Sequence, residues 1–191
     1  SFKDMTGNEE FDKAISWAAE NEITTGWAYN TFRPWDTCKR AAIVTFIWRS
    51  AGKPEAKAAA AFSDMTGNEE FDKAISWAAE NGITTGWDDN TFRPWDTCKR
   101  AAIITFIWRY AGKPSAKSTS LFESFTDVQG VYGKSTDSYK SIMWATAKGI
   151  TKGYSSQTEL LDENNLTAPC FGCDLGCLRE DMILFLYRAV K

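Results

Sequence analysis

A tandem duplication constrains this sequence more than any other feature. Residues 62–114 repeat residues 2–54 at an offset of 60, and the two segments differ at only six of their 53 positions. A third, diverged copy runs from about Phe125 to Ala189 and keeps the order and spacing of the shared positions. Short repeats bury their apolar surface against neighbouring copies, so we expect one assembly of three similar units.

Each copy is expected to contain two helices. In the first half, apolar residues recur at the spacing i, i+3, i+4, i+7 of one helical face, which in copy two is formed by Phe71, Ala74, Ile75 and Ala78. Glycine at Asn81-Gly82 and Lys148-Gly149 can take the left-handed conformation that closes the last turn. Copy one has Glu22 there, which costs about 1 kcal/mol if the same geometry is kept.

The second helix begins near Lys39-Arg40 and is mostly apolar. Its apolar residues leave only a narrow stripe through Thr45 and Arg49, and they are Ile43, Val44, Phe46, Ile47, Trp48 and Ala51. Such a helix is largely buried, and one helix pair cannot hide so much apolar surface alone. The three second helices are therefore expected to form a central bundle with the first helices outside, in an all-α fold of three helix-loop-helix repeats.

The joints between copies mark the unit boundaries. Gly and then Pro follow the second helix in copies one and two, and small residues continue from there. We therefore divide the chain into units at 1–54, 62–114 and 122–191, and the Ala-rich linker before residue 62 could be partly helical. Copy three carries about 12 extra residues near 155–170, which predicts a surface loop.

Composition removes several classes of function. The formal net charge of −3 gives no overall attraction to nucleic acid or to an anionic membrane, and no run approaches the roughly 20 apolar residues of a membrane helix. The chain has no histidine, the usual general base and the commonest metal ligand. We therefore expect no nucleic-acid partner, no membrane insertion, no cofactor and no enzyme. No signal peptide precedes Ser1, and because the chain opens inside a repeat we expect a fragment of a longer protein.

The recurring motifs carry a resemblance to a known family. In copy two, Gly-Ile-Thr-Thr-Gly-Trp spans residues 82–87, Asn-Thr-Phe-Arg-Pro spans 90–94, and Arg-Ala-Ala-Ile opens the segment 100–109. This order resembles the S-layer homology domain, over nearly the whole chain and in the family's usual three copies. The resemblance implies a pseudo-threefold arrangement whose grooves between repeats bind secondary cell-wall polymers, often bearing pyruvylated amino sugars. It also implies an extracellular module that anchors a protein to the bacterial cell wall.

A tetrad at the start of the second helix carries the ligand-binding arginine of that family. The resemblance implies Thr-Arg-Ala-Glu, whereas the tetrads here are Lys-Arg-Ala-Ala at 39–42 and 99–102 and Leu-Arg-Glu-Asp at 178–181. The arginine is present in all three copies, but the Thr and the Glu are lost, so the reciprocal capping box cannot form. Thr37 or Asp36 is the alternative candidate for the helix cap.

The predicted site combines a guanidinium with an aromatic ring in each copy. Arginine can grip a pyruvyl carboxylate by two parallel hydrogen bonds, and the apolar face of a sugar can cover an aromatic side chain. The anion ligands are Arg40, Arg100 and Arg179, the stacking residues are Trp27, Trp87 and Tyr154, and further positive charge comes from Arg33, Arg93, Lys39 and Lys99. The loops differ at Ala28-Tyr29 and Asp88-Asp89, and copy two is expected to be the better site.

Plainer structural roles compete with binding at these positions. The helix-start arginines could pair with the aspartates that open each copy, which are Asp4, Asp64 and Asp127. The two loop tryptophans could cap the core, and the two loop arginines could be solvated surface charges. Copy three has Cys173-Asp174 where Pro94-Trp95 stand in copy two, so its groove is expected to differ.

The five cysteines are odd in number and too few for a disulfide scaffold. Cys38, Cys98 and Cys177 hold equivalent positions, and we expect them to act as buried small hydrophobes. Copy three adds Cys170 and Cys173, for which a local disulfide and a zinc site with Cys177 are both open. We predict no metal site, because no histidine and no evident fourth ligand accompany these thiols.

Two other functions remain open. The first is a protein-binding adhesin or surface-assembly module on the same scaffold, which the lost Thr and Glu of the tetrad favour. The second is a glycosidase, which needs paired carboxylates. Glu9-Glu10 and Glu69-Glu70 are adjacent acids at a helix start, an unusual arrangement for catalysis in duplicated surface turns.

Overall fold

The computed structural model describes residues 1–156 and 166–191, and these residues are helical without a β-strand. The helices are α1 (Glu9–Glu20), a short 3-10 helix at Ala28–Asn30, α2 (Arg40–Ser50), α3 (Glu69–Glu80), α4 (Arg100–Tyr110), α5 (Ser120–Ser124), α6 (Asp137–Ala147) and α7 (Arg179–Val190). The predicted all-α class is confirmed. No helix in the described ranges is long and apolar enough to cross a membrane. The surface loop predicted near 155–170 lies mostly outside the described residues.

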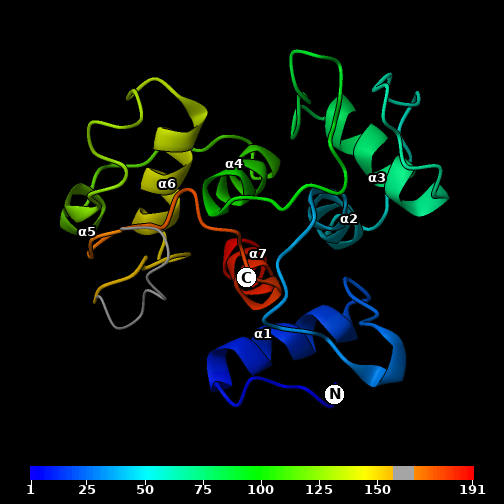
Figure 1. Ribbon diagram of the computed structural model, residues 1–191, viewed down its shortest axis with the longest axis horizontal. Coiled ribbons are helices and arrows are strands. Elements are labelled where there is room, and N and C mark those ends of the chain that lie inside the picture. The colour runs from blue at the N-terminus through cyan, green and yellow to red at the C-terminus, as the bar shows by residue number, and fades with distance from the viewer. Residues whose placement is uncertain (157–165) are drawn as a thin grey trace.

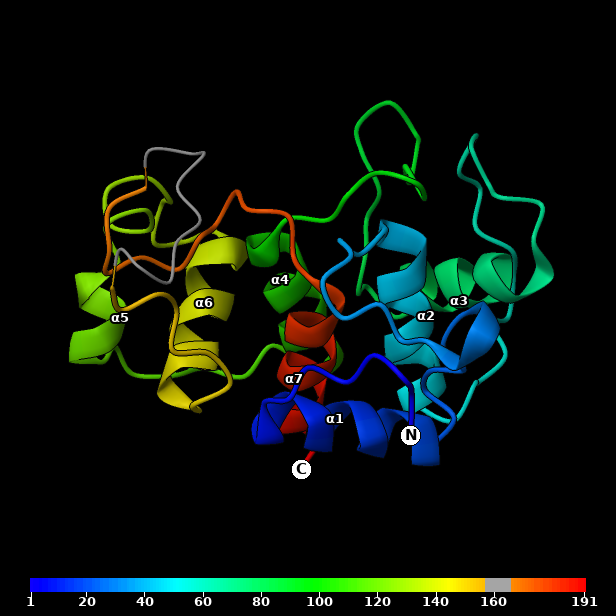
Figure 2. The same ribbon diagram turned by 60° about the horizontal axis from the view of Figure 1, so that its bottom comes forward.

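The second helices of the three copies, α2, α4 and α7, lie together in the middle of the molecule (Figure 1). Helix α4 contacts both α2 and α7, and the buried residues of the three helices are mostly apolar, as at Ile43, Ile103 and Ile183. The first helices α1, α3 and α6 lie outside them (Figure 1), and Figure 2 shows α5 and α6 at one end of the molecule with α3 at the other. The pseudo-threefold arrangement stays a prediction.

Each first helix packs on the second helix of another copy. Helix α3 packs on α2 and α6 packs on α4, while α1 of the first copy packs on α7 of the last. An arginine near the end of each second helix fastens this contact by an ion pair, and the pairs are Arg49 with Glu70, Arg109 with Asp137, and Arg188 with Glu10. The three copies are therefore interlocked in a closed ring.

A ring of main-chain hydrogen bonds joins the three copies just before their second helices. Cys38 N–H donates to the Cys177 carbonyl over 2.9 Å, Cys98 donates to Cys38 over 2.9 Å, and Cys177 donates to Cys98 over 3.0 Å. The three thiols are free and buried, and burial raises the pKa of Cys38 to about 12 and that of Cys98 to about 11. Their predicted role as buried small hydrophobes is confirmed.

The additional cysteines of the third copy form no disulfide. Cys170 and Cys173 are also free and buried, so the local disulfide considered from the sequence is wrong. The Cys173 N–H donates to the Asp127 carboxylate over 2.7 Å, and burial together with the nearby Asp127 charge raises the pKa of the Cys173 thiol. Within the part of the chain that the structure describes, no three His, Cys, Asp or Glu side chains are grouped to hold a metal ion.

Main-chain carbonyls of a neighbouring copy cap each second helix. At the start of α2, Arg40 N–H donates to the Asp96 carbonyl over 3.1 Å, and Ala41 N–H donates to the Pro94 carbonyl over 2.9 Å. The loops of the third and first copies cap α4 and α7 in the same way. The side-chain cap predicted from Thr37 or Asp36 is wrong, because the neighbouring loop already satisfies these donors and no side chain caps α2.

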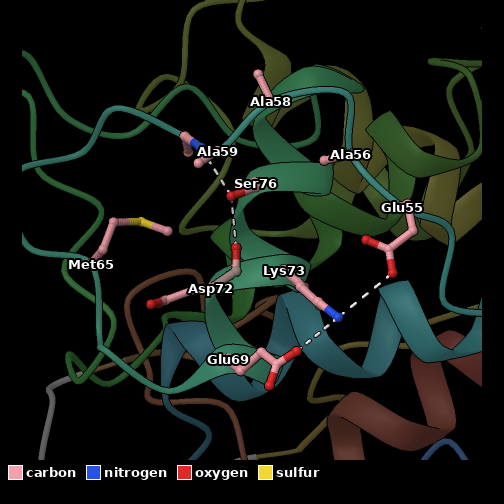
Figure 3. Close-up of a pocket in the computed structure, with 10 residues that line it drawn as sticks. Glu55, Ala56, Ala58, Ala59, Met65, Glu69, Asp72, Lys73 and Ser76 are labelled. Atoms are coloured by element: carbon pink, nitrogen blue, oxygen red, sulfur yellow. Dashed lines mark hydrogen bonds and ion pairs between the residues drawn. The ribbon is translucent and has the colours of Figure 1, made fainter.

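The first linker is extended rather than helical. No helix forms between Pro54 and Ala61, so the partial helix considered for this Ala-rich segment is wrong. The Pro54 carbonyl accepts a hydrogen bond from the Trp48 indole over 2.8 Å, and Ala60 N–H donates to the Ser76 hydroxyl over 2.9 Å. The linker therefore runs along α3 (Figure 3), where it forms one wall of a cavity of about 380 Å³.

The end of α1 gives a first testable prediction. Glu22 has a φ of 56°, in the left-handed region where Gly82 of copy two has a φ of 65° with open space around it. Glu22→Gly should raise the free energy of unfolding by about 0.5–1 kcal/mol, because glycine adopts this conformation without steric cost. The exposed ion pair of Glu22 with Lys53, at 3.7 Å, contributes little. Gly82→Glu should lower stability by a similar amount in urea unfolding, and changes of equal sign in the two variants would contradict the assignment.

Candidate functional site

The aspartate that opens each copy shapes the loop before the second helix. Asp64 accepts hydrogen bonds from the N–H groups of Phe92 over 2.7 Å and Arg93 over 2.8 Å, and Asp4 and Asp127 hold their own loops in the same way. Slight burial raises the pKa of Asp4, but the backbone hydrogen bonds outweigh it and leave the pKa below its ordinary value. These carboxylates hold main-chain groups, so the alternative that they pair with the helix-start arginines is wrong.

The helix-start arginine of each copy inserts into the loop of another copy. Its Nε–H donates to a phenylalanine carbonyl, which pairs Arg40 with Phe92 (2.9 Å), Arg100 with Phe171 (3.2 Å) and Arg179 with Phe32 (2.8 Å). All three arginines are buried, although each carries a charge. The hydrogen bond fixes the guanidinium and leaves its two Nη groups for other partners.

Each arginine therefore meets the predicted stacking residue of a neighbouring copy and not that of its own. The distances from Cζ to the ring centres are 5.8 Å from Arg40 to Trp87, 5.8 Å from Arg179 to Trp27, and 4.8 Å from Arg100 to Tyr154. We call these places the Arg40 site, the Arg179 site and the Arg100 site. Trp27 and Trp87 are 52% and 48% exposed, so about half of each ring is open to a ligand.

The loop arginines add a second guanidinium at two of the sites. Arg33 lies 4.7 Å from the centre of the Trp27 ring, and Arg93 lies 4.3 Å from that of Trp87. The structure therefore brings the predicted loop arginines next to the predicted stacking residues. Each of these tryptophans is contacted by two guanidinium groups, one from its own loop and one from a neighbouring second helix.

The loops of copies one and two hold their arginines differently. Asp89 forms an ion pair of 2.9 Å with Arg93, and hydrogen bonds from Thr91 and Arg93 lower the pKa of Asp89 to about 2. Copy one has Tyr29 at the equivalent position, and the ion pair of Arg33 with Asp36 is 3.9 Å long. The positive charge beside Trp27 is therefore less neutralised than the one beside Trp87.

The two predicted lysines are exposed and engage other loops. Lys99 pairs with Asp174 over 2.6 Å, and Lys39 donates to the Thr97 hydroxyl over 3.3 Å. These partners lie on neighbouring loops and are not part of the Arg40, Arg100 or Arg179 site. The lysines are thus outer charges of the loops, and Asp174 neutralises one of them.

A groove opens at the Arg179 site between residues of all three copies. Its volume is about 220 Å³, and its lining includes Trp27, Ala42, Phe46, Phe71 and Arg179. Aromatic rings form much of its wall, and a buried guanidinium supplies its positive charge. This combination is suited to a ligand that has both an apolar ring face and an acidic group.

The three guanidinium groups differ in their charge partners. Arg100 forms an ion pair with Asp181 of α7, whereas Arg40 and Arg179 have no carboxylate within 4.0 Å among the described residues. Burial lowers the pKa of Arg40 and that of Arg179. At Arg100 burial acts in the same direction, but the Asp181 carboxylate outweighs it and raises the pKa. Two of the sites therefore hold a buried guanidinium that no carboxylate contacts, and Asp36, Asp4 and Asp96 act on these charges only from a longer distance.

Sequence reasoning missed Arg49 as a groove residue. Its guanidinium donates to both carboxylate oxygens of Glu70 over 2.8 Å and to the Ile23 carbonyl over 3.1 Å, which joins two copies at the groove wall. The signal was present, because the same arginine recurs as Arg109 and Arg188 on helices whose middle turns are mostly apolar.

Two exposed tryptophans beside the sites were also not predicted. Trp35 and Trp95 are 61% and 54% exposed. Trp95 packs edge-on against Phe71 with ring centroids 5.5 Å apart, and Phe71 lines the groove of the Arg179 site. The signal for them was a large aromatic residue in the polar turn Pro-Trp-Asp.

Comparison with known proteins identifies the family of the chain. The sequence pattern of the S-layer homology domain matches residues 1–43, 61–104 and 124–158, which together are more than half of the chain. The chain belongs to the S-layer homology domain family. It is also similar to a cellulosome-anchoring protein of Acetivibrio thermocellus, with 26% identity over 167 residues, which cover 85% of this chain and 37% of that relative. The S-layer homology chain described here thus spans well under half of the relative's length.

Glu180, the second residue of α7, gives a pH prediction. Burial raises its pKa to about 7, and the carboxylates of Asp181 and Asp12 act in the same direction. A carboxyl group whose pKa is raised by folding costs no stability below the pKa of the unfolded chain, about 4.3, and destabilises the fold increasingly as the pH rises from there to about 7. Stability should therefore fall by about 1 kcal/mol between pH ~5 and pH ~8, after allowance for solvent screening at this partly exposed group. Glu180→Gln should remove this part of the pH dependence in urea unfolding, and parallel pH profiles for the two proteins would argue against it.

Proposed function

We propose that this chain is a non-covalent anchoring module of a bacterial surface protein, which binds an acidic secondary cell-wall polysaccharide, such as one that bears pyruvylated sugars, between its repeats. The observation that carries the proposal is the Arg179 site, where a buried guanidinium without a carboxylate partner faces a half-exposed tryptophan across a groove. Family membership and the similarity to a cellulosome-anchoring protein support the same role. The module would act outside the cell, on the wall.

The chemistry of such a ligand matches the two unpaired sites. A pyruvyl ketal presents a carboxylate that can accept two parallel hydrogen bonds from the Nη groups of Arg179 or Arg40. The apolar face of the sugar ring then covers the exposed half of the tryptophan. Because Arg33 is less neutralised than Arg93, we expect the Arg179 site to bind more tightly than the Arg40 site. This order differs from the sequence-based expectation, which favoured the second copy.

Three of the four carboxylates in the acidic pairs considered for a glycosidase have structural partners, so we propose no enzymatic role. Glu70 is held by Arg49, and Glu10 is held by Arg188, in the ion pairs that fasten the copies together. Glu69 pairs with Lys73 at 3.0 Å on the surface of α3. A catalytic acid or base must be positioned to exchange a proton with a substrate, and these carboxylates are engaged elsewhere.

A protein-binding or self-assembling module on the same scaffold is the second candidate. The exposed rings of Trp35 and Trp95 favour it, since tryptophan is a frequent anchor of protein interfaces. The variant Trp35→Ala, at a tryptophan that does not line the groove of the Arg179 site, separates the two roles. If wall binding is the function, its affinity for wall polysaccharide should stay within about threefold of the unmodified chain. Two results together would select the second candidate. The unmodified chain would not be retained by the wall, and this variant would lose a crosslinked protein partner or self-association.

The proposal is tested by sedimentation of the purified chain with bacterial wall sacculi, before and after acid removal of their attached polysaccharide. We expect the chain to sediment with intact sacculi, to remain in solution after stripping, and to be displaced by the released polymer. Incubation with that polymer should release no sugar fragments. Equal retention by intact and stripped sacculi would contradict binding to the polysaccharide.

A further inference from the structure

We propose that Asp181 closes the Arg100 site to anions, so that the chain offers two anion-binding sites although it has three repeats. The Asp181 carboxylate pairs with the Arg100 guanidinium and takes the place that a ligand carboxylate would need. The identity of the natural ligand rests on the proposed function. The closure itself depends only on side chains within the chain.

The position of Asp181 in its helix explains why the three sites differ. Asp181 is the third residue of α7, a position that is alanine in the other second helices, Ala42 in α2 and Ala102 in α4. This position faces the arginine of the preceding second helix, because Asp181 reaches Arg100 and Ala42 lines the same groove as Arg179. By the same relation Ala102 faces Arg40. In this chain the Asp181 carboxylate reaches Arg100 and neutralises it, whereas Ala42 leaves the Arg179 guanidinium without a carboxylate in contact.

The ion pair at the Arg100 site is well protected from solvent. The side chains of Arg100 and Asp181 are 4% and 17% exposed, and the ring of Tyr154 lies 4.8 Å from the guanidinium. Separating a buried ion pair leaves each charge without its partner in a medium of low dielectric constant. An external carboxylate must also compete with one that the fold holds permanently beside Arg100. Both effects weaken binding of an anion there.

The third copy also lacks the second guanidinium. Gly172 stands where the other loops have Arg33 and Arg93. Any side chain at Gly172 would collide with Tyr154, since an added Cβ would lie 2.7 Å from the tyrosine ring. The Arg100 site therefore has a single positive charge that is already neutralised. The Arg179 site, in contrast, has two guanidinium groups beside one tryptophan.

The closure can be tested with acetate, a probe that carries a carboxylate and no sugar. The Nε–H group of each site arginine is held by a carbonyl, which makes it a suitable nuclear magnetic resonance reporter. In the unmodified chain, acetate at constant ionic strength should shift the signals of Arg40 and Arg179 and leave that of Arg100 unchanged. Asp181→Asn, which keeps the size of the side chain, should strengthen acetate binding at Arg100 by about tenfold or more.

Reciprocal variants guard against a loss of folding in Asp181→Asn. Ala42→Asp should abolish the response of Arg179, and Ala102→Asp should abolish that of Arg40, each without affecting the other site. A response of Arg100 in the unmodified chain equal to that of the other two would overturn the closure, as would acetate binding that none of the three changes alters. If Arg40 and Arg179 respond to acetate but wall sacculi do not retain the chain, the proposed function fails and the closure stands.

Discussion

Replacement of Arg100 by Met is expected to lower the free energy of unfolding by about 3 kcal/mol. Arg100 is 3% exposed, and its guanidinium donates to the Phe171 carbonyl and pairs with Asp181. Methionine fills part of the volume among the surrounding rings but provides neither the hydrogen bond nor the charge. The buried Asp181 carboxylate would then lack its partner, and such an uncompensated charge accounts for most of the cost. Urea unfolding followed by tryptophan fluorescence measures the change.

Two further variants show whether the lost charge partner is the cause. The double variant Arg100→Met with Asp181→Leu should recover most of the stability, because it removes both charges together. Arg33→Met, at an arginine whose side chain is half exposed, should change stability by no more than about 0.5 kcal/mol. A cost at Arg100 below about 1 kcal/mol, or no recovery in the double variant, would show that the ion pair does not hold the site together.

Replacement of Arg40 and Arg179 by Gln together is expected to lower the affinity for soluble wall polysaccharide by about 100-fold or more. Removing one charged partner of a buried hydrogen-bonded pair costs about 2–5 kcal/mol in binding, and 2.7 kcal/mol corresponds to a factor of about 100. A polymer that engages both sites at once would lose this avidity as well. Isothermal titration with released polysaccharide measures the affinity, and thermal unfolding verifies that the variant is folded.

The chain provides a matched control for this double change. Lys39→Gln with Lys99→Gln removes the same two positive charges from the loops, where both lysines are exposed. If the bound carboxylate contacts the buried arginines, this control should weaken binding by no more than about threefold. A loss as large as that of the arginine variant would mean that overall charge, and not the two sites, governs binding.

The helices were predictable because their signals are local. The apolar spacing of Ala14, Ile15 and Ala18 appears in the sequence, and all three residues are buried in α1. The helix end at Gly82 follows from the conformational freedom of one residue, and the structure places it there with a positive φ. Such features depend on residues a few positions apart, which one sequence is sufficient to show.

The composition of the candidate sites was predictable, but the way they are assembled was not. Arg40 meets Trp87 and not Trp27 of its own copy, because the second helix of one copy enters the loop of another. Nearly identical copies provide no sequence feature that distinguishes these pairings. The capping of α2 by the carbonyls of Pro94 and Asp96 could not be predicted for a similar reason. Every residue has a main-chain carbonyl, so the residue types do not show which ones cap a helix of a neighbouring copy.

The difference between the third site and the others was visible in the sequence as Asp181, yet its meaning was not. In the tetrad at 178–181, Asp181 aligns with the glutamate that the family uses in the capping box. Seen in this way, it is only a replacement in a cap that this chain has lost. In the structure its carboxylate pairs with an arginine 81 positions earlier in the chain. Only the ring-like packing of α7 beside α4 reveals that partner.

The indole N–H signals of the tryptophans provide the most direct test of binding at the Arg40 and Arg179 sites. We predict that released wall polysaccharide, added to the labelled chain, shifts the signals of Trp27 and Trp87 at saturating concentration. The indole N–H groups of Trp48 and Trp108 donate to the carbonyls of Pro54 and Pro114 away from the sites and should not move. Shifts confined to other tryptophans, or none at all while the chain still binds wall sacculi, would contradict binding at these sites.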